Sequence, residues 1–276
     1  MPTWARGFDT SFSQASPDWC RRRWADGYRV AGQDLWTGGY LGNKELRAVA
    51  GDNLRNYREV GFKTIGYINA NPWFPAGLCI TEAETNAGDD GEGWRLLDAL
   101  ALDVEIEGVA EAHIRGLWEA LAGENKPLCL YTRKGFWQAL GNPRWEWLRG
   151  SKLWNAWYDS DQDIDFPANP YGLWTATDLM GEQYQGTTDI EGVLVDLNIF
   201  DLDFFGEGEN VSEIEDLSRL RRDIEELERR MGDMEGSGDF QDSEIVRAHN
   251  RIEGLTAIVD KLDRRQEQAG AALKGE

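Results

Sequence analysis

The stretch Leu100-Ala101-Leu102-Asp103-Val104-Glu105 is short and mostly apolar, yet it carries two carboxylates. Its length and apolar character are typical of a buried β-strand. Helical patterns flank it at Gly93–Leu97 and Val109–Leu121. A strand between two helices is the repeating unit of parallel sheets, in which each helix returns the chain to the start of the next strand. The stretch therefore predicts an α/β fold.

The same alternation continues through the first 206 residues. The predicted strands are Arg6–Phe12, Arg29–Trp36, Thr64–Asn69, Leu100–Ile106, Leu128–Thr132, Leu153–Tyr158, Glu182–Gln185 and Val193–Asn198. The predicted helical regions are Asp18–Asp26, Glu45–Val60, Glu82–Asn86 with Gly93–Leu97, and Val109–Leu121. Eight strands in about 200 residues fit a compact TIM-like (β/α) barrel. We expect it to be irregular at its end, where the last three strands have little helix between them. A doubly wound open sheet is the alternative, but no glycine-rich phosphate loop opens its first helix.

Composition and charge exclude several functions. The chain has 276 residues, of which 41% are hydrophobic, and its 50 acidic and 29 basic residues give a net charge of −21. This charge argues against a nucleic-acid partner, because phosphate recognition needs clustered Lys and Arg. No apolar run approaches the roughly 18 residues that a membrane span needs, so no membrane partner is expected. Two histidines and three scattered cysteines make a poor set for a metal site or a disulfide framework, so no metal is expected.

The composition changes sharply near Gly206. All 13 Trp lie before it, whereas 30 of the last 70 residues are charged, 19 acidic and 11 basic. We therefore expect a globular barrel domain over residues 1–206, a linker over 207–210 and a helical part over 211–276.

The C-terminal part, residues 211–276, carries one apolar stripe. Its apolar residues alternate by three and four, first at Leu217, Leu220 and Ile224 and later at Ile245, Ala248 and Ile252. This pattern predicts two helices that form a hairpin or coiled coil around the turn Gly236–Phe240. Two such helices bury little surface alone, so we expect them to form a homo-oligomer or to attach to a virion protein.

Four carboxylates lie at or near the ends of predicted strands, where parallel barrels place their catalytic groups. They are Asp9, Asp103, Glu105 and Asp196. Because alternate residues of a strand face the same side, Asp103 and Glu105 are expected to point together into the barrel mouth, as are Asp196 and Asn198. Buried carboxyls placed together raise one another's pKa, so that one keeps a proton near neutrality. Cleavage of a glycosidic bond needs that state: a protonated acid beside ionised partners.

An acidic residue at a strand end is often only a helix cap or a solvated loop residue. We assign such a structural role to Asp34, Asp98 and Glu107. For the four candidates above, the shared position at strand ends in otherwise apolar segments favours a common site.

Aromatic residues near the strand ends suit a sugar ligand. Flat rings with polar edges combine apolar stacking on a sugar face with hydrogen bonding. The candidates for substrate binding are Tyr67, Tyr131, Trp157 and Tyr184, together with Asn198.

Six fragments resemble, in the correct order over about residues 6–201, the N-acetylmuramidases of glycoside hydrolase family 25. The most informative is Leu102-Asp103-Val104-Glu105, which resembles the family's Asp-x-Glu strand. Gly7–Ser11 resembles its opening Asp-x-Ser strand, and Val195–Phe200 resembles its closing Val-Asp-x-Asn-x-Phe element. The other fragments are Pro127–Thr132 with Phe136-Trp137, Leu153–Tyr158, and Gln183-Tyr184.

The resemblance implies a (β/α)5β3 barrel that hydrolyses the β-1,4 bond between N-acetylmuramic acid and N-acetylglucosamine in bacterial peptidoglycan, without a cofactor. Glu105 would be the general acid that protonates the leaving oxygen. Asp103 and Asp9 would stabilise charge or position the acetamido group and water, and Asp196 would support them. Whether the route retains or inverts the anomeric configuration stays open.

The chain departs from this family in its second and third strands. Gln33-Asp34 replaces the lysine-bearing pattern common in the second strand, and Tyr67-Ile68-Asn69 stands where the family often has Tyr-His-Phe. The segment Pro72–Trp94 that follows is long and acidic. These differences concern details of the substrate more than the catalytic core.

The leading hypothesis is a muramidase that serves as a bacteriophage lysin. The start of the chain has no basic region followed by an apolar stretch, so we expect no secretory signal. The enzyme would then leave the host cytoplasm with the help of a holin, or be carried on the virion, and act on the cell wall. Two alternatives stay open: a virion tail or glycan-binding protein that keeps the barrel as a scaffold, and an intracellular hydrolase of another glycan.

Overall fold

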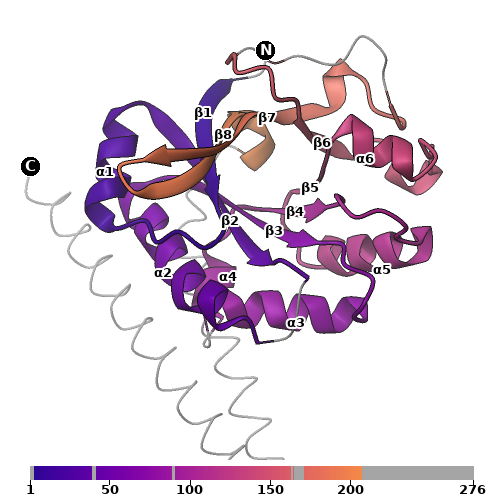
Figure 1. Ribbon diagram of the computed structural model, residues 1–276, viewed down its shortest axis with the longest axis horizontal. Helices are drawn as coiled ribbons and strands as arrows, with labels where there is room; N and C mark the ends of the chain where they lie inside the picture. The colour runs from indigo at the N-terminus through magenta and orange to yellow at the C-terminus, as the bar shows by residue number, and fades with distance from the viewer. Residues whose placement is uncertain (1–2, 39–41, 89–90, 163, 165–170, 207–276) are drawn as a thin grey trace, which may run out of the picture. The chain divides into compact units, whose positions relative to one another are not determined.

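The computed structural model describes residues 3–38, 42–88, 91–162, 164 and 171–206. Within them, the strands form a closed barrel in chain order (Figure 1). The strands are β1 (Trp4–Thr10), β2 (Tyr28–Trp36), β3 (Lys63–Asn69), β4 (Ala99–Asp103), β5 (Leu128–Thr132), β6 (Lys152–Ala156), β7 (Leu179–Ile190) and β8 (Val193–Asp201). The α-helices are α1 (Pro17–Ala25), α2 (Lys44–Val60), α3 (Ala76–Asn86), α4 (Glu92–Arg95), α5 (Glu111–Ala122) and α6 (Lys134–Ala139). Short 3-10 helices are η1 (Glu146–Leu148), η2 (Ala176–Asp178) and η3 (Leu202–Phe205). The predicted linker and C-terminal helices, residues 207–276, lie outside the described residues.

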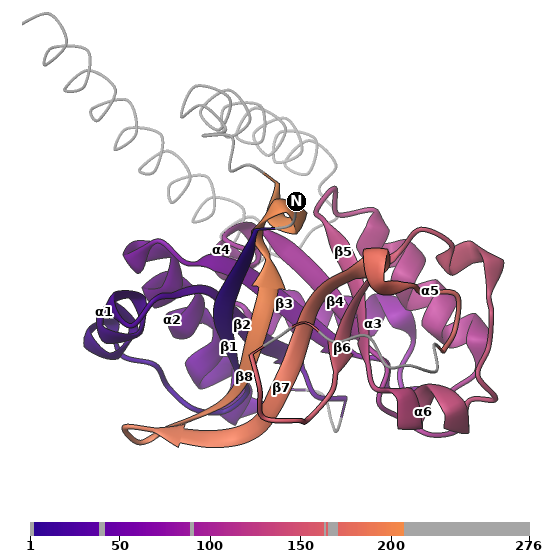
Figure 2. The same ribbon diagram turned by 90° about the horizontal axis from the view of Figure 1, so that it is seen from above.

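The strand directions make this a mixed barrel. Neighbouring strands from β1 to β7 run parallel, and β8 runs antiparallel to both β7 and β1. At least one α-helix follows each of β1 to β5, whereas the described residues after β6 form only 3-10 helices and strands. Figure 2 shows α1 and α2 on one side of the barrel and α5 and α6 on the other, with β7 and β8 between them. The prediction of an irregular TIM-like barrel is confirmed, and the open-sheet alternative is wrong.

The hairpin of β7 and β8 is longer than the sequence predicts. β7 continues to Ile190, five residues past the predicted strand Glu182–Gln185. The added residues are mostly polar, and they are held in the sheet by pairing with β8 rather than by an apolar pattern. Glu191 and Gly192 form the turn with φ values of 55° and 84°. Two consecutive residues with positive φ are typical of the tight turns that match the twist of a hairpin.

The first two helices begin at residues whose side chains cap them. The Ser16 side chain accepts a hydrogen bond from the Trp19 N–H at the start of α1, and Pro17 occupies its first turn. Asn43 caps α2 in the same way through the Leu46 N–H, at 3.1 Å. α2 ends at Gly61, whose φ of 106° suits glycine. These caps fix where the chain turns back toward the next strand.

Two apolar layers surround the barrel wall. The inner layer fills the barrel with side chains that include Val30, Ile65, Ala99, Trp154 and Phe200. The rings of Trp154 and Phe200 meet edge to face with centroids 5.0 Å apart. The outer layer lies between the strands and the helices, and rings there also pack edge to face. The inner layer thus leaves little free space below the mouth of the barrel.

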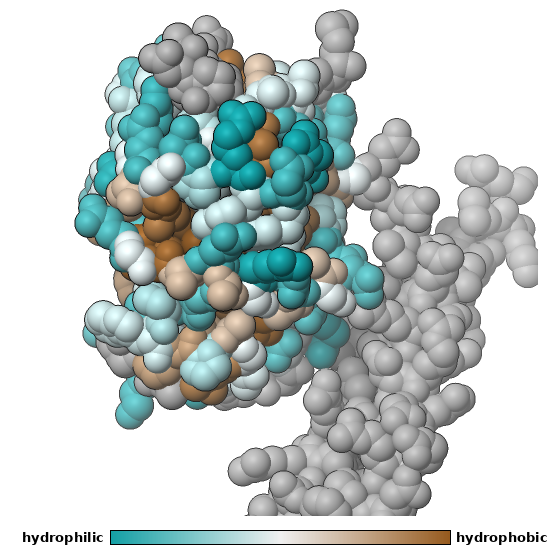
Figure 3. Space-filling model, turned by 90° about the vertical axis from the view of Figure 1, so that its right-hand side faces the viewer, coloured by the Kyte–Doolittle hydropathy of each residue, from teal (hydrophilic) through white to brown (hydrophobic). Residues whose placement is uncertain are grey.

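The outer surface over α5 and α6 is mostly hydrophilic, with several smaller hydrophobic areas between (Figure 3). Trp118 and Trp147 are partly buried against the outer layer. Among the described residues, no helix combines the length and apolar character that a membrane span requires.

Three glycines of the barrel wall make room for larger neighbours. A Cβ on Gly7 would lie 2.5 Å from the Phe200 ring, and one on Gly181 would lie 2.6 Å from the same ring. A Cβ on Gly32 would lie 2.6 Å from the Cβ of Asp9. Real Cβ contacts are longer than this, so Phe200 and Asp9 can occupy their positions only because these neighbours are glycines.

We expect Gly32→Ala to destabilise the protein by about 1–3 kcal/mol, because the added methyl group overpacks a wall that cannot yield without moving β1. The matched control is Gly116→Ala in the interior of α5, where the nearest atom to a new Cβ is 3.9 Å away. Alanine there should stabilise the helix by about 0.5–1 kcal/mol. Urea denaturation measures the free energy of unfolding of both variants. A Gly32→Ala variant that is as stable as the wild type, or more stable, would contradict the close approach of Gly32 and Asp9.

Candidate active site

Five carboxyl side chains converge at the mouth formed by the C-terminal ends of the parallel strands. They are Asp9 of β1, Asp34 of β2, Asp103 at the end of β4, Glu105 on the loop after β4, and Asp196 of β8. We call them the carboxyl cluster. The antiparallel pairing of β1 with β8 places Asp9 directly opposite Asp196. Electrostatic repulsion also connects Asp103 to Glu105, Asp34 and Asp9, and Glu105 to Asp196.

Asp9 is held by two hydrogen bonds, one from a side chain of β3 and one from a side chain of β8. The Tyr67 hydroxyl donates to Asp9 Oδ1 at 3.1 Å, and Asn198 Nδ2 donates to Asp9 Oδ2 at 2.7 Å. The Asp9 side chain is only 5% exposed. Each carboxyl oxygen therefore has a donor, an arrangement that fixes its orientation and suits an ionised carboxylate.

Asp103 is held on one side only. Asn69 Nδ2 donates to Asp103 Oδ2 at 3.1 Å. Asp103 Oδ1 is buried and has no hydrogen-bond partner among the described residues. A buried oxygen without a partner is costly, so it either belongs to a protonated carboxyl or awaits a donor from a ligand.

Asp196 and Glu105 have different surroundings. The Thr187 N–H donates to Asp196 Oδ1 at 2.5 Å, and Gln183 Nε2 donates to Asp196 Oδ2 at 2.6 Å. Glu105 is the more open acid, with 24% of its side chain exposed, and Arg133 Nε lies 3.7 Å from its Oε1. The sequence predicts a strand over Leu100–Ile106 that includes Glu105. In the structure β4 ends at Asp103, so Glu105 lies two residues beyond it. It nevertheless reaches the cluster, since the chain keeps its pairing with β5 for one more residue, through the Val104 N–H that donates to the Tyr131 carbonyl at 2.9 Å.

Burial and like charge shift the titration of the cluster. Burial first, and then the neighbouring Asp196, raise the pKa of Asp9 well above its ordinary value. Burial and then Glu105 raise the pKa of Asp103 in the same way. Burial also raises the pKa of Glu105, although Arg133 opposes the shift. The pKa of Asp196 is raised by burial against the hydrogen bonds that it accepts. The cluster therefore holds protons at a pH at which isolated carboxyls are ionised.

Aromatic rings line the mouth and form its floor. Trp154 lies below the cluster, 4.8 Å from the ring of Tyr131 and 6.0 Å from that of Tyr67 between centroids. Its Nε1 donates to Asn198 Oδ1 at 2.9 Å, so the floor orients the amide that holds Asp9. Tyr131 and Tyr158 both donate to Gln183 Oε1.

Most sugar-binding candidates from the sequence lie at this mouth, but one does not. Tyr67, Tyr131 and Asn198 contact the cluster or its hydrogen-bond partners. Trp157 follows β6 and is partly exposed. Tyr184 is 2% exposed in the outer layer between barrel and helices, so its ring has no face open to a ligand at the mouth. Its neighbour Gln183 faces the cluster instead.

Several residues of the site were not among the candidates from the sequence. Asp34, which the sequence suggests is a helix cap or a solvated loop residue, is instead buried in β2 and belongs to the cluster. Trp154 and Gln183 lie within the motifs Leu153–Tyr158 and Gln183-Tyr184, and the alternation along β6 would have indicated Trp154. By contrast, Asp98 is structural as expected, since it accepts from the Thr64 N–H and pairs with Arg58 at 2.6 Å.

No group of three or more His, Cys, Asp or Glu residues is arranged to hold a metal ion, as far as the described part of the chain extends.

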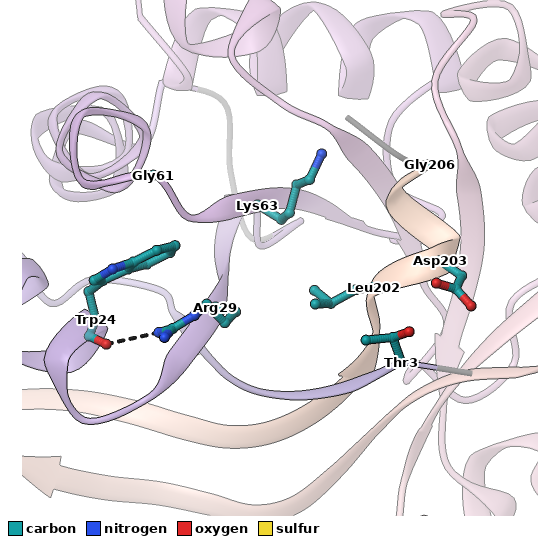
Figure 4. A pocket seen from close by; sticks show the side chains of 8 residues that line it. All are labelled: Thr3, Trp24, Arg29, Gly61, Lys63, Leu202, Asp203 and Gly206. Carbon is teal, nitrogen blue, oxygen red and sulfur yellow. Dashed lines mark hydrogen bonds between the residues drawn. The ribbon is translucent and has the colours of Figure 1, made fainter. Parts of the chain in front are cut away.

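A cavity of about 280 Å³ opens at the opposite end of the barrel, where the parallel strands begin (Figure 4). Its lining residues are Thr3, Trp24, Arg29, Gly61, Lys63, Leu202, Asp203 and Gly206. The Arg29 guanidinium lies over the Trp24 ring, 4.2 Å from its centroid, and donates to the Trp24 carbonyl. The guanidinium is therefore already bound to groups of the protein. The carboxyl cluster, not this cavity, is the candidate active site.

Comparison with solved structures finds distant likeness in fold. No protein-family model matches the sequence, and no curated protein matches it. The fold is similar to the crystal structure of the Clostridium perfringens spore cortex lytic enzyme SleM, with a TM-score of 0.48 and 16% identity over 71% of this chain and 67% of that chain. At this distance the likeness does not bear on function.

The raised pKa of Asp103 predicts how stability depends on pH. A carboxyl whose pKa is higher in the folded protein favours folding at low pH, and this contribution is lost as the pH rises from about 4, the unfolded value, through the folded pKa. Asp103→Asn keeps the acceptor for Asn69 but cannot ionise. We therefore expect the variant to be more stable than the wild type at pH 7–8, by about 1 kcal/mol or more, with a smaller difference at acid pH.

Denaturation curves over this pH range measure the difference. The matched control is Asp98→Asn, which loses the ion pair with Arg58 and should destabilise the protein. If Asp103→Asn is as harmful as Asp98→Asn at pH 8, the ionised Asp103 is not a cost to the fold.

Proposed function

We propose that the protein is a glycoside hydrolase that cleaves the β-1,4 bond between N-acetylmuramic acid and N-acetylglucosamine in peptidoglycan. The observation that carries the proposal is the carboxyl cluster itself, in which buried acids with raised pKa values face one another above an aromatic floor. Hydrolysis of a glycosidic bond requires a proton donor and a carboxylate in one site. The substrate class comes from the sequence resemblance to glycoside hydrolase family 25.

Glu105 is the proposed general acid. Its raised pKa lets it keep its proton to a higher pH than an isolated glutamate, and its partial exposure lets it reach a glycosidic oxygen from the mouth. Arg133 lies close enough to stabilise the glutamate after the proton has left.

The three other predicted acids have complementary roles in this proposal. Burial raises the pKa of Asp9, but the hydrogen bonds from Asn198 and Tyr67 favour its ionised form, which supplies negative charge against the positive charge that develops on the sugar ring. The unpartnered Oδ1 of Asp103 suits an N–H donor, such as the acetamido group of the substrate. Asp196 holds Gln183, which in turn accepts from Tyr131 and Tyr158, so it orients the aromatic side of the mouth.

Exposed apolar side chains on nearby loops fit a long polysaccharide. Trp73, on the loop after β3, is 73% exposed, and Tyr158, just after β6, is 51% exposed. Both loops leave the C-terminal ends of parallel strands, which is the end where the cluster lies. Rings in such positions stack on sugar faces without burying them.

The bacteriophage setting, release by a holin or carriage on the virion, and the assembly role of residues 211–276 are proposals from the sequence alone. A glycan-binding barrel without turnover is the second candidate function. The cost of burying several carboxyls favours an enzyme, because binding alone does not require acids with raised pKa values.

Incubation of the full-length protein with purified peptidoglycan tests the proposed function directly. We expect new reducing ends, and mass spectrometry should find muramic acid at those ends. Products that end in N-acetylglucosamine, or cleaved peptides, would contradict the assignment. Binding to peptidoglycan without any new reducing ends would support the scaffold alternative.

We expect Glu105→Gln to lower turnover by about 10²–10⁴-fold, because glutamine keeps the shape of the side chain but has no proton to transfer. The matched control is Glu107→Gln, the same substitution two residues along the loop at an exposed position. It should keep wild-type turnover. Rates of reducing-end formation, measured with folded protein as judged by circular dichroism, decide the outcome; near-normal turnover of Glu105→Gln would remove Glu105 from its role.

A further inference from the structure

Arg133 brings a positive charge to the mouth that holds the carboxyl cluster. It follows β5 directly, and its side chain is 47% exposed. Within the described residues it forms the one ion pair that reaches the cluster, with its Nε 3.7 Å from Glu105 Oε1. The Trp137 N–H donates to the Arg133 carbonyl at 3.1 Å and so fixes the backbone here. The guanidinium therefore lies beside the proposed general acid.

The Arg133 guanidinium is oriented, but its hydrogen-bond donors are not used. Its Cζ lies 4.4 Å from the centroid of the Phe136 ring, a position in which the ring attracts the cation. Its contact with Glu105 is made through Nε and is longer than a hydrogen bond. In the described part of the chain, none of its N–H groups has a hydrogen-bond partner. The planar fork of N–H groups is therefore available to a ligand at the mouth.

The charge of Arg133 has no counterpart when Glu105 is ready to react. A general acid holds its proton before the reaction, and a protonated Glu105 offers Arg133 no negative charge. The barrel domain, residues 1–206, carries 31 acidic and 18 basic residues, so its overall charge repels an anionic ligand. A half-exposed cation with free donors would draw an anionic group of the substrate to this side of the mouth.

We propose that Arg133 is a specificity-determining residue that binds a carboxylate of the substrate. The proposal rests on the proposed function, in which Glu105 lies at the scissile bond. A guanidinium matches a carboxylate through two parallel N–H···O bonds, which are stronger than bonds between neutral groups.

Peptidoglycan offers a carboxylate in two places. One is the lactyl group of muramic acid where the stem peptide is absent, and the other is the stem peptide itself. An uncharged polymer of N-acetylglucosamine has neither group. Arg133 would therefore favour peptidoglycan over such a polymer.

Binding measured without turnover tests the proposal. In the Glu105→Gln background, the side chain beside Arg133 carries no charge and cleavage is too slow to consume the glycan. A change in affinity then cannot come from the ion pair. The probes are purified glycan strands without stem peptides and strands that keep them. Each is used with free carboxylates and after conversion of the carboxylates to methylamides, and calorimetry gives the Kd.

Addition of Arg133→Gln to this background should weaken the binding of a carboxylate form by about 10–100-fold, because charge-assisted hydrogen bonds are lost. The corresponding methylamide form should bind as before. A loss with the peptide-free strands identifies the lactyl carboxylate, whereas a loss confined to the peptide-bearing strands identifies the stem peptide. Equal losses for the carboxylate and methylamide forms, or no loss with any strand, would overturn the proposal.

The matched control is Arg149→Gln, the same substitution between η1 and β6, at the end of the barrel opposite the cluster. The Arg149 guanidinium already donates to both carboxyl oxygens of Glu146, at 2.7 and 2.8 Å. We expect its substitution to leave every affinity unchanged.

New reducing ends from the wild type report on the proposed function separately. If the wild type cleaves no peptidoglycan but Arg133→Gln shows the carboxylate-specific loss, the proposed function fails and the carboxylate site stands. If the wild type cleaves peptidoglycan but Arg133→Gln leaves all affinities unchanged, the proposed function stands and this proposal fails.

Discussion

The interior of the barrel has room for a few large side chains, and glycines decide where they go. Phe200 occupies the space that Gly7 and Gly181 leave on its two neighbouring strands, and Asp9 sits against Gly32. These close approaches let β8 lie between β7 and β1 and close the barrel. Closure in turn brings Asp196 opposite Asp9. Without that contact, the acids of the first and last strands would lie on separate edges of a sheet.

Closure by an antiparallel strand also explains the form of the site. A parallel last strand would need a crossover helix, and its inward acid would lie at the end of the strand. Because β8 enters from the hairpin after β7, Asp196 comes early in the strand and still reaches the mouth. Gln183 on β7 and Asn198 on β8 then hold Asp196 and Asp9 from the same hairpin.

Burying the acids of the carboxyl cluster next to one another costs electrostatic free energy, which the surrounding fold offsets. Trp154, Phe200 and Tyr131 pack below the acids and exclude water from one side, which raises the pKa values of the carboxyls. The same rings supply the hydrogen bonds that limit this cost, since Trp154 orients Asn198 and Tyr131 orients Gln183. The apolar floor and the acids are therefore one unit: a change in either alters the proton affinity of the other.

The place of a residue in the site could be predicted where it follows the two-residue alternation along a strand. It could not be predicted where it depends on a β-bulge or on the register between strands. Asp9, Asp103 and Asp196 stand at positions where short apolar strands end or turn polar, a pattern readable without a structure. Asp34 has the same kind of position, but nothing local distinguishes an acid that caps a helix from one that faces a cluster.

Tyr184 and Gln183 illustrate the limit most clearly. The two are adjacent, so one must face the barrel and the other the helices, and the register of β7 against β8 shifts between Gln183 and Gln185. Period-2 alternation cannot be followed through such a shift.

The α/β alternation, the irregular end of the barrel and the four candidate acids could be predicted from the sequence, because strand length, apolar patterning and motif order are local properties. Only the folded structure shows which acids meet, which amides hold them and in which direction their pKa values shift. Those outcomes depend on barrel closure, on strand register and on burial, which arise only when residues nearly 190 positions apart, such as Asp9 and Asn198, come within 2.7 Å of each other.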